Sequence, residues 1–560
     1  MPSKKNPLVQ LPAGASNRAL QAAQAHWKLR GWNTAYSLFK ALDDAGDLNS
    51  DDLERYGISA YLTDREDEFL MIFERGFERC SEDYQMRNAI RFAFWLGLTH
   101  MFRGEFGKGG GWFARAGGIL QDIGSDCVES GYLMLPSIEQ DIDADNLVAA
   151  TKAAIEAAEI GTRFCDNDLV VMARHLQGRV ELKAGNLEAG FAIFDDVMLS
   201  VTGGSLSPIV TGLVYCSVID ACHEILDFGR TKEWTEALSD WCDEQPELVA
   251  FTGQCMIHVA EFRQIDGSWK KSEAQARLAC QTLEGSAYSG RAGTAYYRLG
   301  EIHRLQGDFA QAENDYRAAS KFGFDPQPGR ALMHLHQGRH KLASSGIGRA
   351  LATTQVPQNR IGLLQAQTEI MVATGEFELA REAVNELALH SKTYRTDAVR
   401  AVAAQAKGLF DLSAGNPSAA YFELRKAADV WQQLGASYNN ARVQVLLGRT
   451  CQALGDMGGA ELELTAALDV FIALGATADQ AVARNALSPK LATGTDQLTT
   501  RQIEILRYIA RGDTNRKIAD ELGLSERTID RHVSNILMRL DVPTRSAATA
   551  YAYTQKLLTE

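Results

Sequence analysis

Residues Leu299–Ala319, LGEIHRLQGDFAQAENDYRAA, predict two short helices joined by a turn at Gly307. Ala312 and Ala319 are small enough for two antiparallel helices to cross closely, and Tyr316 lies between them to fill the remaining space. Glycine suits such a turn because it adopts a positive φ without strain. We therefore expect a helical hairpin in this segment.

The same spacing recurs along the chain. An alanine follows each turn glycine by five residues, a larger apolar residue by nine, and an alanine or leucine by twelve. Weaker copies lie nearer the N-terminus, at Gln177–Phe194 and Val259–Ala279. This pattern resembles the tetratricopeptide repeat, which implies an all-α, tetratricopeptide-like helical solenoid with a concave face suited to binding. The turn glycines, 31, 37, 40 and 40 residues apart, are Gly307, Gly338, Gly375, Gly415 and Gly455.

A second pattern occupies the C-terminal end. The segment Leu498–Leu540 reads LTTRQIEILRYIARGDTNRKIADELGLSERTIDRHVSNILMRL and predicts three short helices. Gly523 ends the second helix, and the third is expected to last to about Leu540. Two short helices, a glycine turn and a longer third helix form the helix-turn-helix pattern. The residues expected to cap the three helices are Thr499 with Gln502, then Thr514, then Ser525.

The third predicted helix has two distinct faces. Ile529, Val533, Ile536 and Leu540 form an apolar stripe, because about 100° of rotation separates successive residues. Arginine on the opposite face can donate two hydrogen bonds to guanine, and asparagine can pair with adenine. The start of the second helix suits a phosphate. A bundle with merely solvated arginines is the alternative. The predicted DNA contacts are Thr514, Asn515, Arg516, Lys517, Arg527, Thr528, Arg531, His532, Ser534 and Asn535.

This C-terminal segment resembles the DNA-binding domain of LuxR-type (NarL/FixJ-like) transcription regulators, over about a tenth of the chain. The resemblance implies double-stranded DNA as a partner and a fourth helix at about Ser546–Leu558 that carries the contact of a DNA-bound homodimer. The implied contact residues are Ala547, Ala548 and Tyr551. The positions that match the family pattern are Leu498, Thr499, Arg501, Leu506, Gly512, Asn515, Ile518, Ala519, Ser525, Thr528, His532, Asn535, Ile536, Leu540, Val542, Arg545 and Ala548.

Three positions depart from the usual pattern of that family. Asp530 stands where a lysine is usual, and an aspartate there could accept from cytosine, repel phosphate or pair with a neighbouring arginine. Lys517 and Gln502 each replace a glutamate, and the glutamine can still cap its helix. The operator sequence therefore cannot be carried over from relatives.

Charge is divided unevenly along the chain, whose net charge is −14. From residue 498 onward ten Lys and Arg face eight Asp and Glu, whereas the remainder carries 47 against 63. The candidate DNA-binding segment is thus the only basic part, and the acidic remainder of the chain discourages wrapping of DNA around it.

Nine cysteines without a C-x-x-C predict buried free thiols in a reducing cytosol. No apolar span suits export or a membrane, so a cytoplasmic protein is expected.

Catalytic and metal-binding motifs are not recognisable in the sequence. The segment Gly104–Trp112, GEFGKGGGW, lacks the spacing of a phosphate-binding loop and is expected to be a repeat turn followed by a helix start. His336 and His340 have a spacing that can hold zinc, but no acidic or cysteine partner is near, so a structural role is expected. We therefore predict no enzyme activity, no cofactor and no metal.

Together these features predict a cytoplasmic transcription regulator that is a homodimer on DNA. Its solenoid would sense a small molecule or a protein partner, and RNA polymerase is a further candidate partner. One alternative is an interaction scaffold whose C-terminal domain docks protein rather than DNA, and another is a nucleotide hydrolase with an unrecognised site. We expect a tail at 1–18, the solenoid at 19–487, a linker at 488–497 and the helix-turn-helix domain at 498–560.

Overall fold

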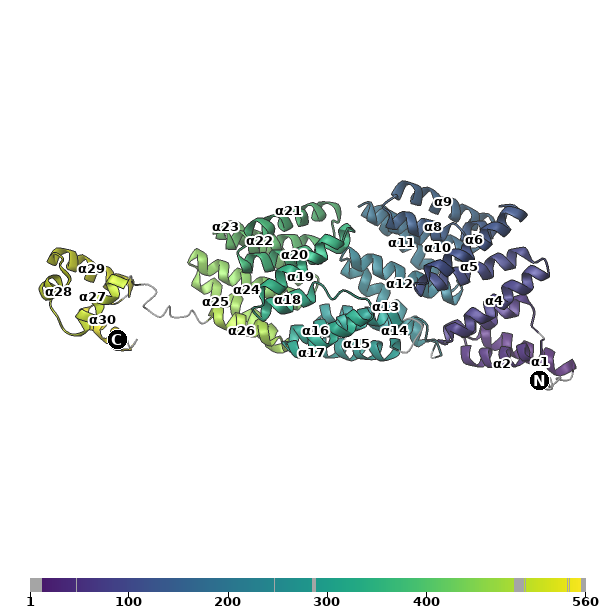
Figure 1. The fold of residues 1–560 in the computed structure, drawn as a ribbon, viewed down its shortest axis with the longest axis horizontal. Coiled ribbons are helices and arrows are strands. Elements are labelled where there is room, and N and C mark those ends of the chain that lie inside the picture. The colour runs from purple at the N-terminus through teal and green to yellow at the C-terminus, as the bar shows by residue number, and fades with distance from the viewer. Residues whose placement is uncertain are drawn as a thin grey trace, which may run out of the picture.

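The protein is all-α. A computed structural model describes residues 13–46, 48–245, 247–284, 289–487, 498, 500–540, 542 and 544–554, and these ranges contain helices and no strand. The predicted fold class is confirmed. Helices α1 to α26 stack as antiparallel neighbours (Figure 1). The first of them begins at Ala13, earlier than the predicted start of the solenoid, and the predicted linker lies outside the described residues.

The solenoid helices have similar lengths, apart from short α7, α8 and α18. Their bounds are α1 Ala13–Lys28, α2 Trp32–Asp44, α3 Ser50–Leu62, α4 Glu66–Glu82, α5 Met86–Phe102, α6 Phe106–Ile123, α7 Val128–Tyr132, α8 Leu135–Asp143, α9 Leu147–Arg163, α10 Asn167–Lys183, α11 Leu187–Thr202, α12 Pro208–Glu224, α13 Phe228–Asp243, α14 Thr252–Ile265, α15 Trp269–Leu283, α16 Ser289–Gln306, α17 Phe309–Lys321, α18 Gly329–His336, α19 His340–Thr353, α20 Pro357–Thr374, α21 Phe377–Thr393, α22 Asp397–Ser413, α23 Pro417–Gln433, α24 Ser437–Leu454, α25 Met457–Leu474 and α26 Thr477–Leu487.

The predicted repeat is confirmed by the turns and by the core. The five turn glycines have φ values of 86°, 70°, 81°, 81° and 82° in chain order. The residues five, nine and twelve positions after each glycine are all buried. The small residues therefore lie where the paired helices cross, and the larger ones fill the space between them.

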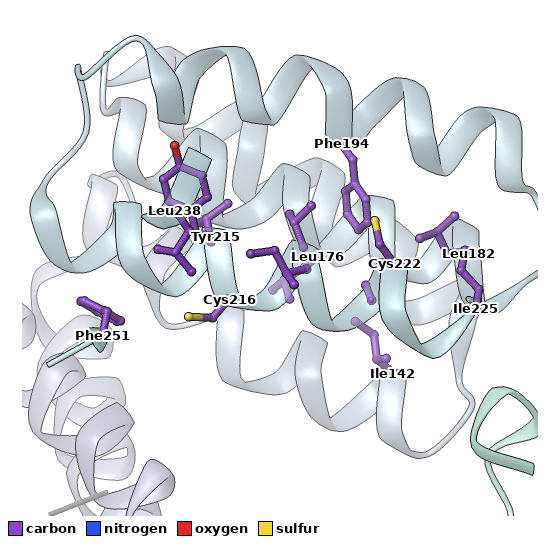
Figure 2. Packing of buried hydrophobic residues seen from close by; sticks show 14 of the residues in the cluster. Ile142, Leu176, Leu182, Phe194, Tyr215, Cys216, Cys222, Ile225, Leu238 and Phe251 are labelled. Atoms are coloured by element: carbon purple, nitrogen blue, oxygen red, sulfur yellow. The ribbon is translucent and has the colours of Figure 1, made fainter. Parts of the chain in front are cut away.

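Paired helices approach closely where a glycine faces a large side chain sixteen residues later. A Cβ atom added at Gly178 would lie 2.5 Å from a ring carbon of Phe194, which is fully buried in the core shown in Figure 2. Only glycine leaves room for such a contact. The other pairs with this relation are Gly57 with Phe73, Gly76 with Phe92, Gly97 with Phe113, Gly300 with Tyr316, Gly408 with Leu424 and Gly448 with Leu464.

Residues far apart in the sequence also touch, because the solenoid winds back upon itself. Thr396 Oγ1 donates to the carbonyl of Ile225 at 2.8 Å, and Thr477 Oγ1 donates to the carbonyl of Gln306 at 2.7 Å; both pairs are 171 residues apart. Nearer the N-terminus, Val249 N donates to the carbonyl of Leu62 at 2.8 Å. Successive superhelical turns are therefore in direct contact, unlike an open solenoid in which each hairpin touches only its neighbours.

The motifs singled out in the sequence lie at hairpin turns as expected. Gly104 has a φ of 73° in the turn before α6, and His336 ends α18 with its Nδ1 2.9 Å from the carbonyl of Leu332. Within the described ranges no group of His, Cys, Asp or Glu is arranged to hold a metal ion, and no helix there is both long and apolar enough to cross a membrane.

The prediction that the cysteines are buried is wrong in part, because Cys165 is exposed and Cys242 is half-buried.

Candidate nucleic-acid interface

The C-terminal helices enclose a small core of their own. They are α27 (Thr500–Ala510), α28 (Asn515–Leu522), α29 (Glu526–Arg539) and α30 (Arg545–Thr554). The predicted stripe of α29 is buried, with exposed fractions between 0% and 9%, and packs on buried side chains of the other three helices. This confirms the predicted division of α29 into an inner and an outer face. The buried residues of the neighbouring helices include Ile505, Leu506, Ile509, Ile518, Ala548 and Ala552.

Capping hydrogen bonds define the starts of α28 and α29. Thr514 Oγ1 accepts from Lys517 N at 3.3 Å, and Ser525 Oγ accepts from Thr528 N at 3.1 Å, so both predicted caps are confirmed. Gly523 has a φ of 64° and ends α28. The predicted partner Thr499 of the first cap lies outside the described residues. The capped turn sets the angle at which α29 leaves α28.

The predicted DNA contacts that the structure describes lie on the surface around α28 and α29. Thr514, Arg516, Lys517 and Ser534 are exposed. Four others, Asn515, Thr528, His532 and Asn535, are half-buried. For Arg527 and Arg531 only the backbone within α29 is described. Each described residue of this set is therefore at least partly exposed to solvent.

Asn515 is held from both sides within the domain. Its Nδ2 donates to Oδ1 of Asp530 on α29, and its Oδ1 accepts from Nη1 of Arg545 at 2.5 Å. Nη2 of Arg545 donates to the carbonyl of Asp513, also at 2.5 Å. Burial lowers the pKa of Arg545, and the charges of Asp513 and Asp530 only partly oppose this. Asp530, which stands where the family usually has a lysine, is thus hydrogen-bonded to the side-chain amide of Asn515, and Arg545 is hydrogen-bonded to the oxygen of the same amide.

Two further side chains are occupied within the domain. Lys517 Nζ lies 2.6 Å from Oδ1 of Asp513, a contact that raises the pKa of the exposed ammonium. Arg501 Nη2 donates to the carbonyl of Leu522 at 3.1 Å and thereby satisfies the end of α28. Neither Arg501 nor Arg545 was predicted to have a role in the site, although their match to the family pattern could have indicated one.

Helix α30 has an inner and an outer side. Ala548 is fully buried in the core of its own chain, so it is a core residue and not an exposed contact, contrary to its predicted part in a dimer. Ala547 and Tyr551 are partly exposed, and Tyr553 is 63% exposed. The small size of Ala548 serves the close packing of α30 on α27.

Comparison with known proteins identifies the C-terminal region. Residues 496–552 match the family of bacterial regulatory proteins of the luxR type, GerE. The transcriptional regulatory protein LiaR of Bacillus subtilis is 43% identical over 63 residues, and the response regulator protein VraR of Staphylococcus aureus is 41% identical over 63 residues. Each alignment covers 11% of this chain and 30% of the relative, so this chain spans under a third of those proteins.

The solenoid has a distant likeness to a solved structure. The crystal structure of the APC/C hetero-tetramer Cut9–Hcn1 aligns over 86% of this chain and 97% of the other, with 13% identity and a TM-score of 0.35, which is too low to bear on the fold. The assignment that the comparisons support concerns the C-terminal end: helices α27 to α30 form a LuxR-type helix-turn-helix domain.

Proposed function

We propose that this protein is a DNA-binding transcription regulator in which α29 enters the major groove of double-stranded DNA. The observation that carries the proposal is the turn between α28 and α29, where Gly523 ends α28 and Ser525 caps α29, so that α29 presents one face outward while the other is buried in the domain core. This is the geometry by which a helix-turn-helix places its second helix in the groove. The related LiaR is a transcriptional regulatory protein and VraR is a response regulator, and both agree with this role.

The predicted contacts divide by the part of DNA that they would meet. Thr514, Arg516 and Lys517, at the start of α28, suit the phosphate backbone, because amide donors and cations gather there. The outer face of α29, with Arg531 and Asn535, suits base edges. Phosphate contacts set affinity for any duplex, whereas base contacts set the preference for one sequence.

Binding of the full chain to DNA tests this proposal directly. Genome-wide recovery of bound fragments, followed by anisotropy titration on a recovered fragment and on a random duplex, is expected to show preferential binding that weakens as salt rises. A chain that enriches no genomic fragment and binds neither duplex at about 50 mM salt would overturn the proposal. Recovery of a protein partner without DNA would instead favour a docking role for the C-terminal domain.

We also propose that the protein binds DNA as a homodimer in the cytoplasm, with contact through α30. The partly exposed residues Ala547 and Tyr551, together with the exposed Tyr553, provide small and aromatic surface for a symmetric contact. Analytical ultracentrifugation with and without a bound duplex is expected to detect the dimer on DNA. A single chain on a duplex of full site length would refute it. RNA polymerase is the partner through which such a regulator would act on a promoter.

The proposed sensing role is supported by a cavity inside the solenoid. Its volume is about 200 Å³, and its walls come from alternate helices, α14, α16, α18, α20, α22 and α24. Each charged side chain of the wall has an ionic partner: Arg442 contacts Glu369, also on the wall, and Arg304 Nη2 lies 2.8 Å from Oε2 of Glu301, which is not part of the lining. Because the charges are balanced, we propose that the effector is a small polar molecule without a large net charge.

A ligand in this cavity would bridge several hairpins and could favour one arrangement of the solenoid. A thermal-shift screen of small polar metabolites, followed by DNA titration with each hit, tests this. Substitution Gln365→Ala alters the cavity wall, whereas Gln432→Ala changes an exposed glutamine outside it and is the matched control. A ligand that binds in this cavity is expected to bind the Gln365→Ala variant more weakly and the Gln432→Ala variant with unchanged affinity. Equal affinity for the two variants would place the ligand site elsewhere.

A further inference from the structure

The side chains at the start of α28 differ in how far they are available to a phosphate. Arg516 is exposed, and no hydrogen bond or ion pair joins its side chain to a residue that the structure describes. Lys517 is also exposed, but its Nζ lies 2.6 Å from Oδ1 of Asp513. Asn515 is half-buried, and its Nδ2 donates to Oδ1 of Asp530. Two of these three successive side chains are therefore occupied by carboxylates of their own domain.

Asp513 is fixed in the turn before α28. Its N–H donates to the carbonyl of Tyr508 at 3.1 Å, and its own carbonyl accepts from Nη2 of Arg545 at 2.5 Å. The side chain of Asp513 is 13% exposed, against 62% for that of Lys517. Lysine also has a long, flexible stem. Lys517 is therefore the partner that can swing away, while the carboxylate of Asp513 stays in place.

The carboxylate of Asp530 on α29 occupies the amide of Asn515 on α28. The amide nitrogen has two N–H bonds, and Asp530 accepts from one of them. The amide oxygen accepts from Nη1 of Arg545 at 2.5 Å, so the amide cannot rotate by half a turn without losing both bonds. Asp530 is itself exposed. Its negative charge therefore opposes the approach of a phosphate to the second N–H bond of Asn515.

A carboxylate and a phosphate offer these donors the same kind of partner. Both present anionic oxygens, which accept charge-assisted hydrogen bonds from ammonium and amide groups. The exposed pair of Lys517 with Asp513 is of a weak kind, because water screens both charges. The dense row of phosphates on a duplex can therefore compete for Lys517, but the lost ion pair lowers the affinity that results.

We propose that Asp513 and Asp530 act as internal substitutes for DNA phosphates. In the free protein they occupy Lys517 and Asn515, so a duplex must displace the first pair and approach against the charge of the second. Binding to any duplex is then weaker than the cations of the domain alone would allow, and base contacts supply a larger share of the affinity. This inference rests on the proposed function in DNA binding.

Salt titration of DNA binding by the full chain tests the pair of Asp513 and Lys517. Asp513→Asn frees the ammonium, so affinity for a recovered site and for a random duplex is expected to rise about threefold to tenfold at about 50 mM salt. The slope of log K against log salt concentration is expected to steepen by up to about 1, because no vacated carboxylate then attracts a cation in exchange. In a Lys517→Ala background this gain is expected to disappear.

Asp520→Asn is the matched control for the change in net charge. Asp520 is an exposed residue of α28 that makes no hydrogen bond or ion pair with a described residue. Its substitution therefore measures the effect of charge alone, and hydrogen exchange in α27 to α30 checks that each variant keeps its fold. A gain for Asp513→Asn no larger than that of the control, or a gain that persists in the Lys517→Ala background, would overturn the proposal for this pair.

Two substitutions at one position test the second pair. Asp530→Asn removes the charge but keeps an oxygen that can accept from Asn515, whereas Asp530→Ala removes both. Each is expected to tighten binding to both duplexes, and Asp530→Ala by about twofold more, a difference that disappears in an Asn515→Ala background. Equal affinities of the two variants with Asn515 present would overturn the proposal for Asp530. Absence of DNA binding by the unsubstituted chain would overturn the proposed function as well, whereas unchanged affinity and slope in every variant of a chain that binds DNA would overturn this inference alone.

Discussion

Glu66, at the start of α4, offers a sharp test of the packing because both of its carboxylate oxygens are buried without a hydrogen-bond partner. Its exposed fraction is 3%. Burial raises the pKa of Glu66 to about 7, and the charge of Arg103 offsets this only in part. An amide of the same shape cannot ionise, so Glu66→Gln is expected to stabilise the N-terminal helices at neutral pH.

The size and the sign of this effect follow from the shift in pKa. In the unfolded chain the carboxyl ionises near pH 4.5, whereas in the folded chain it ionises near pH 7. Below about pH 4.5 both states are protonated, so Glu66→Gln gains little. As the pH rises from 4.5 to 7, ionisation of Glu66 increasingly favours the unfolded state of the unsubstituted protein. Above pH 7 the free energy of unfolding that Glu66→Gln gains reaches at most about 3 kcal/mol.

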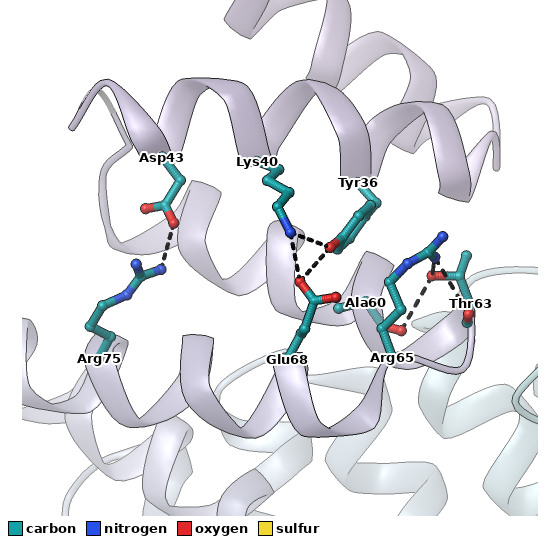
Figure 3. A network of polar contacts seen from close by, with 8 residues as sticks. All are labelled: Tyr36, Lys40, Asp43, Ala60, Thr63, Arg65, Glu68 and Arg75. Atoms are coloured by element: carbon teal, nitrogen blue, oxygen red, sulfur yellow. Dashed lines mark hydrogen bonds and ion pairs between the residues drawn. The ribbon is translucent and has the colours of Figure 1, made fainter. Parts of the chain in front are cut away.

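Glu68, two residues further along α4, provides a control of opposite sign. Its carboxylate accepts from Tyr36 and lies 3.0 Å from Lys40 Nζ (Figure 3). Burial opposes ionisation, but these hydrogen bonds outweigh it and lower the pKa of Glu68. Glu68→Gln is therefore expected to lose about 0.5–1 kcal/mol above pH 4.5, a loss that fades as pH falls through the depressed pKa.

Hydrogen exchange in peptides of α3 to α5 suits this comparison, because a chain of this length need not unfold in one step. Exchange at pH 5, 6, 7 and 8 is corrected for the intrinsic rate at each pH. We expect a gain in protection for Glu66→Gln that grows with pH, and a loss of protection for Glu68→Gln. A gain that does not change with pH, or lower protection in Glu66→Gln at pH 8, would refute it.

Three further predictions concern the DNA-binding surface and the solenoid core. Arg531→Ala is expected to weaken binding to a recovered site by about 1–3 kcal/mol and a random duplex by less, whereas Arg516→Ala should weaken both alike; anisotropy titration on the two duplexes distinguishes them. Asp530→Ala removes a negative charge from the DNA-facing side and should tighten binding to both duplexes, more so at low salt, so unchanged binding would contradict it. Gly178→Ala forces Phe194 aside and should destabilise its hairpin by about 1–3 kcal/mol, seen as faster hydrogen exchange in α10 and α11.

Local patterns in the sequence determined most of what could be predicted. The hairpins could be predicted because each depends on residues within about twenty positions of one another, such as Gly455 with Ala460, Leu464 and Ala467. The helix caps at Thr514 and Ser525 could be predicted for the same reason, because the backbone N–H donor lies three residues after the hydroxyl acceptor.

Contacts set by tertiary packing escaped prediction. Nothing in the local sequence pairs Thr396 with Ile225 across 171 residues, because that contact depends on the accumulated twist of many hairpins. The bond between Asn515 and Asp530 crosses the α28–α29 turn, and its formation depends on the angle between those helices. The burial of Ala548 was missed because a run of alanines in α30 does not reveal which side packs on α27.

The contacts between superhelical turns determine how far a local change can act. In an open solenoid a change at one hairpin reaches distant ones only through each intervening neighbour. Here the α13–α14 turn contacts the N-terminal helices directly. Later in the chain, the ring of Trp269 packs edge-on against the ring of Tyr438, with ring centroids 5.2 Å apart. Tyr438 also lines the proposed effector cavity. A ligand that moves Tyr438 must therefore disturb the packing between α15 and α24, so binding and the closure of the superhelix are linked through one side chain.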